Sequence, residues 1–447
     1  MDRSKSCIKA LIIVSFGLLA VTVSAATDFT LSPDEPLFTS VYNYSIMTNT
    51  GESCNSPGWS LDGCEIAFVC RKWKEPCNCT SLWEGCVEGP ALLNIMNSDG
   101  SDRRILSNLT VLSVPSWNPQ GTHLLILGGE YTDSFQNPEN KGYWLVAKDG
   151  SNQQFLFNDS VLSYSWSPDG SNIAYLSKVK GICLEKNVDG TCNYEQNAYV
   201  LKIFNLSTSL SRELNQVSDP QWIQQSIKWT EDGKEVVFLS QENRTSYGQY
   251  LLVRVNVETG QVNEIPVVTD SDYRVSMVAW NPCSDIFAYL TNTSFNNTNL
   301  VRIVDPIEGT DIPLTKEGYH TLLSWNPDGT RLGYSYHGDI WVINPDGTDV
   351  TRLTMNGSIR SFSWQPNGSC IVFNENEKVT DCEPQLGYFG IGWPQQEKIW
   401  QNWTTASRIG VMDLDKPVES SIPSPIFDIL AVILATGVLV VIGHKRR

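Results

Sequence analysis

Seven short segments of the chain repeat one pattern, and this repeat constrains the fold more than any other feature. Each segment has a tryptophan, a turn rich in Asn, Pro, Asp and Gly, and then an alternating apolar strand. The repeat tryptophans, spaced 39 to 63 residues apart, are Trp59, Trp117, Trp166, Trp229, Trp280, Trp325 and Trp364. A period of about 40–60 residues with this much strand signal is typical of the blades of a β-propeller.

The turn after each tryptophan has a chemistry suited to a tight reversal. Proline presets the first backbone angle, aspartate binds the turn backbone and glycine accepts a positive φ. The tryptophan that precedes this turn is large and apolar, so we expect it to pack between neighbouring blades.

A second module follows each repeat and supplies two further strands; Gly338–Thr354 is the clearest copy. The sequence therefore predicts an all-β, seven-bladed propeller of four-stranded blades over residues 27–423. We expect the strand at Phe38–Met47 to be the outer strand of blade seven, where it closes the ring and covers an open sheet edge. A six-bladed ring is the alternative, if the Cys-rich part of the first repeat forms a separate subdomain.

The Trp-x-Pro-Asp-Gly-x-x-Ile-Ala-Tyr element at Trp166–Tyr175, and the Ile-Trp-Val-Ile-Asn-Pro-Asp-Gly-Thr run at Ile340–Thr348, resemble the WD-like repeat of TolB-type β-propellers. The resemblance covers roughly residues 38–423. It implies the fold but no particular activity, because propellers carry unrelated functions on one scaffold.

Both ends of the chain predict an exterior location. Residues 1–26 have cations, the apolar run Ala10–Val23 and small residues, as in a signal peptide; a retained membrane helix is the alternative. Residues 424–447 contain the apolar run Ile426–Gly443 and a basic end, which predicts a transmembrane segment with a cytoplasmic tail. We therefore expect a single-pass protein of the cell membrane whose large domain faces outward.

The tripeptide Pro425-Ile426-Phe427 before that apolar run resembles the C-terminal sorting signal of archaeal surface proteins, which an archaeosortase-type enzyme processes. The family's tripeptide is of the Pro-Gly-Phe type, so this chain differs at the middle position. A permanent membrane helix and a processed lipid anchor both stay open.

Sequons and cysteines also indicate the exterior. The pattern Asn-x-Ser/Thr marks eleven glycosylation candidates: Asn43, Asn78, Asn108, Asn158, Asn205, Asn243, Asn292, Asn296, Asn356, Asn367 and Asn402.

Ten cysteines in groups of six, two and two predict local disulfides: Cys54, Cys64, Cys70, Cys77, Cys79 and Cys86; Cys183 and Cys192; Cys370 and Cys382. A zinc site at Cys70, Cys77, Cys79 and Cys86 is the alternative for the first group. Cys283 is left over.

The long insertions fall between the second and third strands of the blades, so we expect them at one end of the ring. The longest span residues 71–90, 178–197 and 376–406. Aromatic residues on these loops are the predicted ligand-binding set, namely Trp73, Trp83, Tyr131, Trp393, Trp400 and Trp403. Such rings offer flat contact surfaces to sugars or proteins. The alternative is that each ring covers a small core under its own loop.

The net charge of −17 argues against nucleic-acid binding, because few cations are available to neutralise phosphates. No nucleophile elbow, zinc-protease motif or P-loop occurs, and the propeller leaves no room for a separate hydrolase domain. We expect a non-enzymatic binding or envelope-structural module without a cofactor or metal, whose partner is a cell-envelope protein or glycan. The alternatives are an extracellular carbohydrate-active enzyme, a hydrolase or lyase using carboxylates of the loop-rich face, and a purely architectural surface-layer component.

Overall fold

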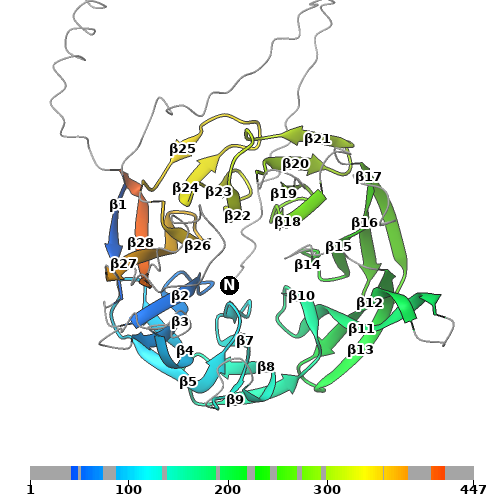
Figure 1. Cartoon of the computed structure of the whole chain (residues 1–447), viewed down its shortest axis with the longest axis horizontal. Helices are drawn as coiled ribbons and strands as arrows, with labels where there is room; N and C mark the ends of the chain where they lie inside the picture. The colour runs from blue at the N-terminus through cyan, green and yellow to red at the C-terminus, as the bar shows by residue number, and fades with distance from the viewer. Residues whose placement is uncertain are drawn as a thin grey trace, which may run out of the picture.

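The molecule is a ring of seven four-stranded blades around a central axis (Figure 1). This computed structural model describes residues 42–48, 52–73, 87–132, 138–187, 192–218, 227–241, 249–268, 274–292, 298–355, 357–380 and 404–417. The predicted all-β, seven-bladed architecture is confirmed, and the six-bladed alternative is wrong, because the first Cys-rich repeat supplies ordinary blade strands.

The predicted signal peptide and C-terminal membrane segment lie outside the described residues. Within those residues, no helix is long and apolar enough to cross a membrane.

Blades one to three are consecutive along the chain. Their strands are β2 (Glu52–Trp59), β3 (Glu65–Trp73), β4 (Val87–Asn97) and β5 (Arg104–Val111); β6 (Ser116–Trp117), β7 (His123–Glu130), β8 (Glu139–Ala147) and β9 (Gln153–Phe157); β10 (Val161–Trp166), β11 (Asn172–Lys186), β12 (Cys192–Asn205) and β13 (Leu210–Ser218).

Blades four to six continue in the same order. Their strands are β14 (Ile227–Trp229), β15 (Glu235–Gln241), β16 (Gln249–Asn256) and β17 (Val262–Val268); β18 (Arg274–Trp280), β19 (Phe287–Asn292), β20 (Val301–Asp305) and β21 (Thr310–Pro313); β22 (His320–Trp325), β23 (Leu332–Tyr336), β24 (Asp339–Ile343) and β25 (Thr351–Arg352).

Blade seven closes the ring with strands from both ends of the described chain. It contains β26 (Ile359–Trp364), β27 (Cys370–Thr380), β28 (Thr404–Pro417) and, on the outside, β1 (Tyr42–Ile46). Strand β1 runs antiparallel to β28, with Tyr44 opposite Met412 and Ile46 opposite Gly410. The predicted closure by the N-terminal strand is confirmed.

The core is distributed over the seams between blades rather than gathered in one place. Among the described residues, each of the seven seams has its own apolar cluster. The aromatic residue at the last position of the repeat pattern is fully buried there in five blades, namely Phe68, Tyr175, Phe238, Tyr289 and Phe373. Every blade is therefore held by both neighbours, which makes ring closure a condition for burying all seven clusters.

One seam also has backbone pairing. The end of β5 in blade one pairs with β7 in blade two, through Thr110 opposite Gly129 and Val111 opposite Gly128. A Cβ added to Gly128 would lie 2.5 Å from the Thr110 carbonyl oxygen, so this close approach needs glycine. Blades one and two thus form a continuous sheet.

The turns between the first and second strands have the predicted chemistry. In blade three, Asp169 accepts hydrogen bonds from Ser167 Oγ (2.6 Å) and the Ser171 amide (3.0 Å). Gly170 has a φ of 67°, which a side chain would strain. These bonds lower the pKa of the Asp169 carboxyl, with the Ser167 hydroxyl the largest cause.

Candidate functional site

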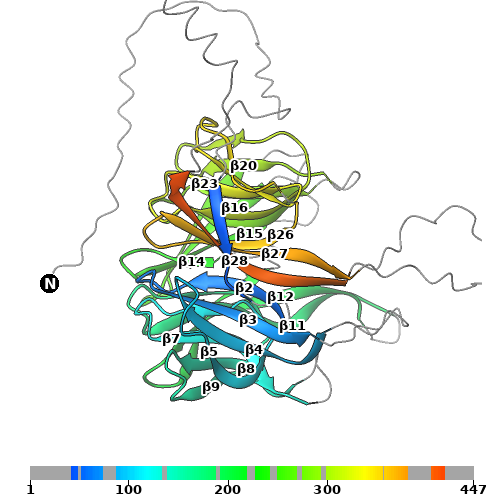
Figure 2. The same cartoon turned by 90° about the vertical axis from the view of Figure 1, so that its left-hand side faces the viewer.

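The two ends of the ring differ in the length of their connections. Tight turns join the first and second strands at one end, and long insertions join the second and third strands at the other. The insertion at 178–197 is mostly an extended hairpin rather than a loop, because β11 and β12 stay paired out to Lys186 opposite Cys192. The β27–β28 hairpin is also long, and both hairpins project to the same side (Figure 2).

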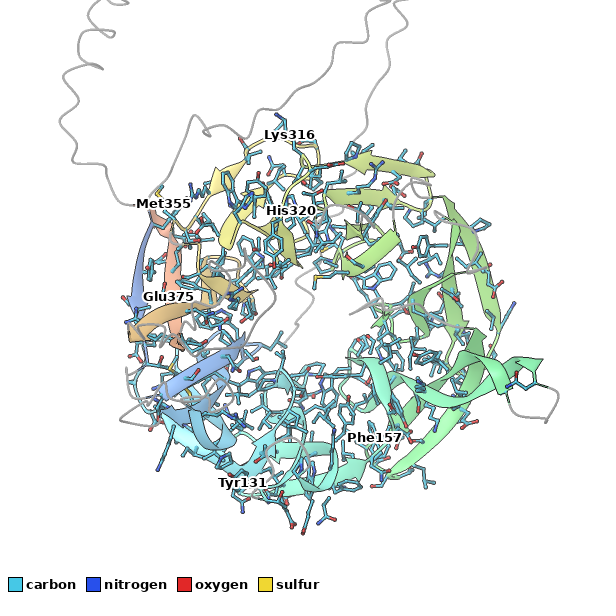
Figure 3. All side chains as sticks on the ribbon, viewed as in Figure 1. Tyr131, Phe157, Lys316, His320, Met355 and Glu375 are labelled. Carbon is cyan, nitrogen blue, oxygen red and sulfur yellow. A yellow bond between two sulfur atoms is a disulfide. The ribbon has the colours of Figure 1, made fainter. Side chains whose placement is uncertain are left out.

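Among the predicted ligand-binding aromatics, only Tyr131 has a described side chain. Tyr131 follows β7, is 41% exposed and lies near the outer edge of the ring (Figure 3). Trp73 ends β3, but its side chain is outside the described set, as are Trp83, Trp393, Trp400 and Trp403. The proposal that these rings bind a ligand stays a prediction.

Two cysteines of the first group form a disulfide. Cys54 and Cys70 are opposite each other on β2 and β3 and are bonded, which removes Cys70 from the alternative zinc site. Cys64, grouped with them from the sequence, is instead an exposed free thiol.

In the remaining groups, Cys192 is disulfide-bonded and Cys370 begins β27. The side chains of Cys77, Cys79, Cys86, Cys183 and Cys382 lie outside the described set. Their predicted pairings are untested.

Some predicted glycosylation sites have described side chains. Asn108, Asn158 and Asn367 are exposed, whereas Asn205 is half-buried and donates a hydrogen bond to Asn172 Oδ1 (2.9 Å). Asn43 and Asn292 lie on strands, but their side chains are outside the described set. The remaining candidates are outside the described residues: Asn78, Asn243, Asn296, Asn356 and Asn402.

A pocket lies at the opposite end of the ring, among the tight turns of blades three, four and five. Its volume is about 540 Å³, within the range of about 300–1,000 Å³ that small-ligand sites occupy. We name it the turn-end pocket. Its lining includes Trp166, Pro168, Lys228, Trp229, Thr230, Glu231, Trp280, Pro282, Cys283, Ser284 and Asp285. A smaller pocket of about 260 Å³ adjoins it between blades five and six and shares Trp280 and Pro282.

Most repeat tryptophans tie one blade to the blade before it. The indole N–H of Trp117, Trp229, Trp325 and Trp364 donates to a carbonyl oxygen of the preceding blade, over 2.9 to 3.1 Å. The acceptor is always the residue just before the previous repeat tryptophan, as in Trp325 to Ala279. The expectation that these side chains pack between blades is confirmed.

Trp166 and Trp280 differ from that pattern. Each is partly exposed, and the indole N–H of each is buried without a hydrogen-bond acceptor. Trp59 also lacks an acceptor, but it is 7% exposed and packs in the seam between blades seven and one. Trp166 and Trp280 are therefore the two repeat tryptophans that are partly exposed and lack the hydrogen bond to the preceding blade. Both line the turn-end pocket.

Lys228 is the cation of this pocket, and its charge is already engaged. Its Nζ donates to the Ser284 carbonyl oxygen (2.7 Å) and lies 3.3 Å from Asp285 Oδ1. It also lies 5.1 Å from the centre of the Trp280 ring, a cation–π contact. Burial lowers the pKa of the Lys228 ammonium, although the negative charge of Asp285 opposes this shift.

Asp285 is held from a second side. Arg254 on β16 pairs with Asp285 Oδ2 at 2.5 Å and with Glu235 Oε2 at 2.7 Å. The pocket wall at the seam of blades four and five is thus a chain of alternating charges. Because each side chain holds the next in place, we expect this wall of the pocket to be rigid.

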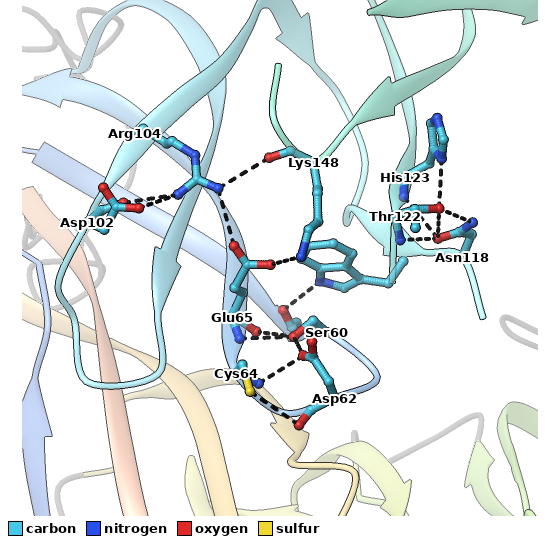
Figure 4. Close-up of polar contacts among 12 residues, drawn as sticks. Ser60, Asp62, Cys64, Glu65, Asp102, Arg104, Asn118, Thr122, His123 and Lys148 are labelled. Carbon is cyan, nitrogen blue, oxygen red and sulfur yellow. Dashed lines mark hydrogen bonds and ion pairs between the residues drawn. The ribbon is translucent and has the colours of Figure 1, made fainter. Parts of the chain in front are cut away.

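The same position in blade one carries a comparable charge cluster outside the turn-end pocket. Glu65 begins β3 and lies between Arg104 Nη2 (3.2 Å) and Lys148 Nζ (2.9 Å) (Figure 4). Hydrogen bonding to Glu65 raises the pKa of Lys148, against the opposing effect of burial. Since Lys148 follows β8, this cluster connects blades one and two.

Only one group of candidate metal ligands occurs among the described residues. It contains Glu52, Cys54 and Cys70. Both sulfur atoms belong to the disulfide, so they are not available as thiolate ligands. This group does not fit a metal ion.

The comparisons with known proteins show the fold. No protein-family model matches the chain, and no curated protein is similar to it in sequence. An oligogalacturonate lyase from Vibrio parahaemolyticus is similar in structure, with a TM-score of 0.56, 11% identity, and coverage of 83% of this chain and 93% of that one.

Two further solved structures have different coverage. An acylaminoacyl peptidase from Pyrococcus horikoshii has a TM-score of 0.50 and 10% identity, and the match covers 73% of this chain but 50% of the peptidase. TolB from Acinetobacter baumannii has a TM-score of 0.40 and 17% identity, covering 66% of this chain and 64% of TolB. At identities of 10–11%, the likeness to the lyase and the peptidase extends to the propeller fold and not to an activity.

Proposed function

We propose that the chain is a non-enzymatic binding module of the cell exterior, and that it recognises its ligand at the turn-end pocket. This proposal rests on the exposure and the missing hydrogen bonds of Trp166 and Trp280. Five of the seven repeat tryptophans donate a hydrogen bond to the preceding blade or are buried in a seam, whereas these two lack that bond, are partly exposed and line one pocket. Partly exposed tryptophan beside fixed polar groups is characteristic of recognition surfaces.

The exterior location draws support from cysteine chemistry. The Cys54–Cys70 disulfide and the disulfide at Cys192 suit an oxidising compartment. The predicted signal peptide, glycosylation sites and C-terminal membrane segment or lipid anchor agree with this proposal. The partner we expect is therefore a component of the cell envelope.

The proposal is tested by binding measurements on the purified chain with an array of envelope glycans and peptides. We expect saturable binding that Trp280→Ala and Trp166→Ala each weaken at least tenfold. Trp117→Ala is the control, because Trp117 is also a partly exposed repeat tryptophan but does not line this pocket. Since this variant also loses the hydrogen bond to Gly58, thermal unfolding must show that it stays folded.

Other outcomes would contradict the proposal in different ways. Binding lost in Trp393→Ala and Trp403→Ala, but kept in the pocket variants, would place the site at the insertion end. Formation of new reducing ends or unsaturated sugars from polysaccharide would instead support the carbohydrate-active enzyme. The absence of binding to any probe would favour the architectural role.

A further inference from the structure

We infer that the ligand of the turn-end pocket is a neutral glycan rather than an acidic one. This inference rests on the proposed function and names the chemical class that the pocket selects. It follows from three features of the pocket: its aromatic surface, its balance of charges and the engagement of its single lysine.

The aromatic surface suits a sugar ring. Trp166 and Trp280 come from blades three and five and both line the pocket, with Trp229 of blade four between them in the ring order. Trp229 is 8% exposed and tied to Ser165, so it contributes mainly as packing. The Trp166 indole and the part of the Trp280 indole that Lys228 does not cover would supply apolar surface for the C–H faces of a pyranose, and their blades set the spacing between them.

The charges disfavour an anionic ligand. The pocket contains one lysine and two carboxylates, at Asp285 and Glu231, so its formal charge is −1. A carboxylate or sulfate on a sugar would lie near these groups and would be repelled. The net charge of −17 on the whole chain adds to this unfavourable field.

Lys228 does not provide a compensating cation. Its ammonium is shared between Asp285, the Ser284 carbonyl and the Trp280 ring, and its side chain is only 18% exposed. An acidic ligand would have to displace Asp285, which Arg254 also holds. A neutral hydroxyl can instead approach the pocket without breaking this ion pair. The same charges that stabilise the wall therefore select against uronates.

The test compares neutral and uronic oligosaccharides of equal length by isothermal titration calorimetry, using the full chain. We expect the neutral series to bind at least tenfold more tightly than a tri- to pentagalacturonate series. Trp280→Ala should abolish the binding of the neutral series, whereas Trp280→Phe should retain most of it because the ring is kept. Glu231→Lys replaces a carboxylate of the pocket lining with an ammonium, so it should reduce or reverse the preference for neutral over uronic oligosaccharides.

Failure of this inference and failure of the proposed function give different results. Tighter binding of galacturonates at a site that depends on Trp280 would overturn the neutral class and leave the binding function intact. Peptide binding with the same dependence would do likewise. Binding that no pocket variant changes would overturn both. Thermal unfolding of each variant checks that lost binding does not come from lost structure.

Discussion

The repeat tryptophans have two different roles in this fold: some link neighbouring blades, and others line the turn-end pocket. Trp325 is 7% exposed, and its indole N–H donates to the Ala279 carbonyl oxygen at 2.9 Å, which fixes the seam between blades five and six. Trp280, one repeat earlier, makes no such bond, and its ring lies under Lys228. A single indole hydrogen bond therefore separates a tryptophan that links two blades, such as Trp325, from one that lines the pocket, such as Trp280.

This difference predicts unequal effects of the same substitution. Trp325→Phe removes a buried hydrogen bond and should lower the free energy of unfolding by about 1 kcal/mol more than Trp280→Phe does. Phenylalanine at 280 keeps a ring beneath Lys228 and loses an N–H that has no acceptor. Urea denaturation of both variants measures the difference, and equal destabilisation would contradict the assigned roles.

A buried histidine makes stability depend on pH. His320 is on inner strand β22 of blade six (Figure 3) and is 2% exposed. Its Nδ1 lies 3.1 Å from both oxygens of Asn299. Burial lowers the pKa of His320 from 6.5 to about 4, and the nearby His337 adds to this shift. The unfolded chain therefore takes up a proton at a higher pH than the folded chain does.

The stabilisation that neutral His320 provides is complete above pH 6.5 and is lost as pH falls from 6.5 through about 4. We expect the loss to reach about 3 kcal/mol. The turn aspartates do not account for this window, because their pKa values lie below 3.8, as for Asp62 and Asp169. His320→Phe keeps a ring beside Tyr336 and should flatten the pH dependence of unfolding. An unchanged slope in this variant would assign the effect to other groups.

At the scale of elements, the sequence allowed the strand repeat and the closing strand to be predicted, but not the roles of individual side chains. Turn chemistry and alternation are local, so they identify each blade. All seven repeat tryptophans look alike in sequence, and which of them is tied depends on the spacing of blades far apart in the chain. Likewise, nothing local marks Lys148 as the partner of Glu65. The insertion at 178–197 was expected as a loop because it lies outside the repeat pattern. In the structure, the pairing of β11 with β12 continues into it.

The hairpin of β2 and β3 has a covalent link as well as backbone pairing. The Cys54–Cys70 disulfide closes a segment with a sequence separation of 16 and lies in the cluster between blades seven and one. Replacing both residues by alanine should lower the free energy of unfolding by about 3 kcal/mol, chiefly by freeing the unfolded chain. Denaturant melts measure this. Cys64→Ser is the control and should leave stability unchanged; equal behaviour of the two variants would be against a stabilising role.

At the scale of the whole molecule, β1 and the residue after it, Met47, connect the start of the described chain to blade seven. The Met47 amide donates to the Ile409 carbonyl oxygen at 2.8 Å, and the Tyr44 ring meets Phe373 edge-on at 5.2 Å. Since the clusters of blade seven face both neighbours, detaching β1 weakens the one blade that joins the two ends of the described chain.

Met47→Pro tests this closure because proline has no amide hydrogen to donate. We expect a loss of at least about 1 kcal/mol of unfolding free energy, together with faster amide hydrogen exchange in β28. Met47→Leu keeps both the amide and an apolar side chain and should remain close to the parent. If the two variants unfold alike, β1 contributes little to holding the ring.

The pairing of β1 with β28 also has a consequence for biosynthesis. Residues 42–46 leave the ribosome early, whereas their partner strand at 404–417 is made after six other blades. Until then β1 has no place to dock, and the flanks of the first and seventh blades stay uncovered. A nascent or prematurely terminated chain therefore exposes unpaired strand edges, which chaperones and proteases recognise. These edges are covered only after β28 has been made, so a chain that stops before β28 cannot bury the seams of blade seven.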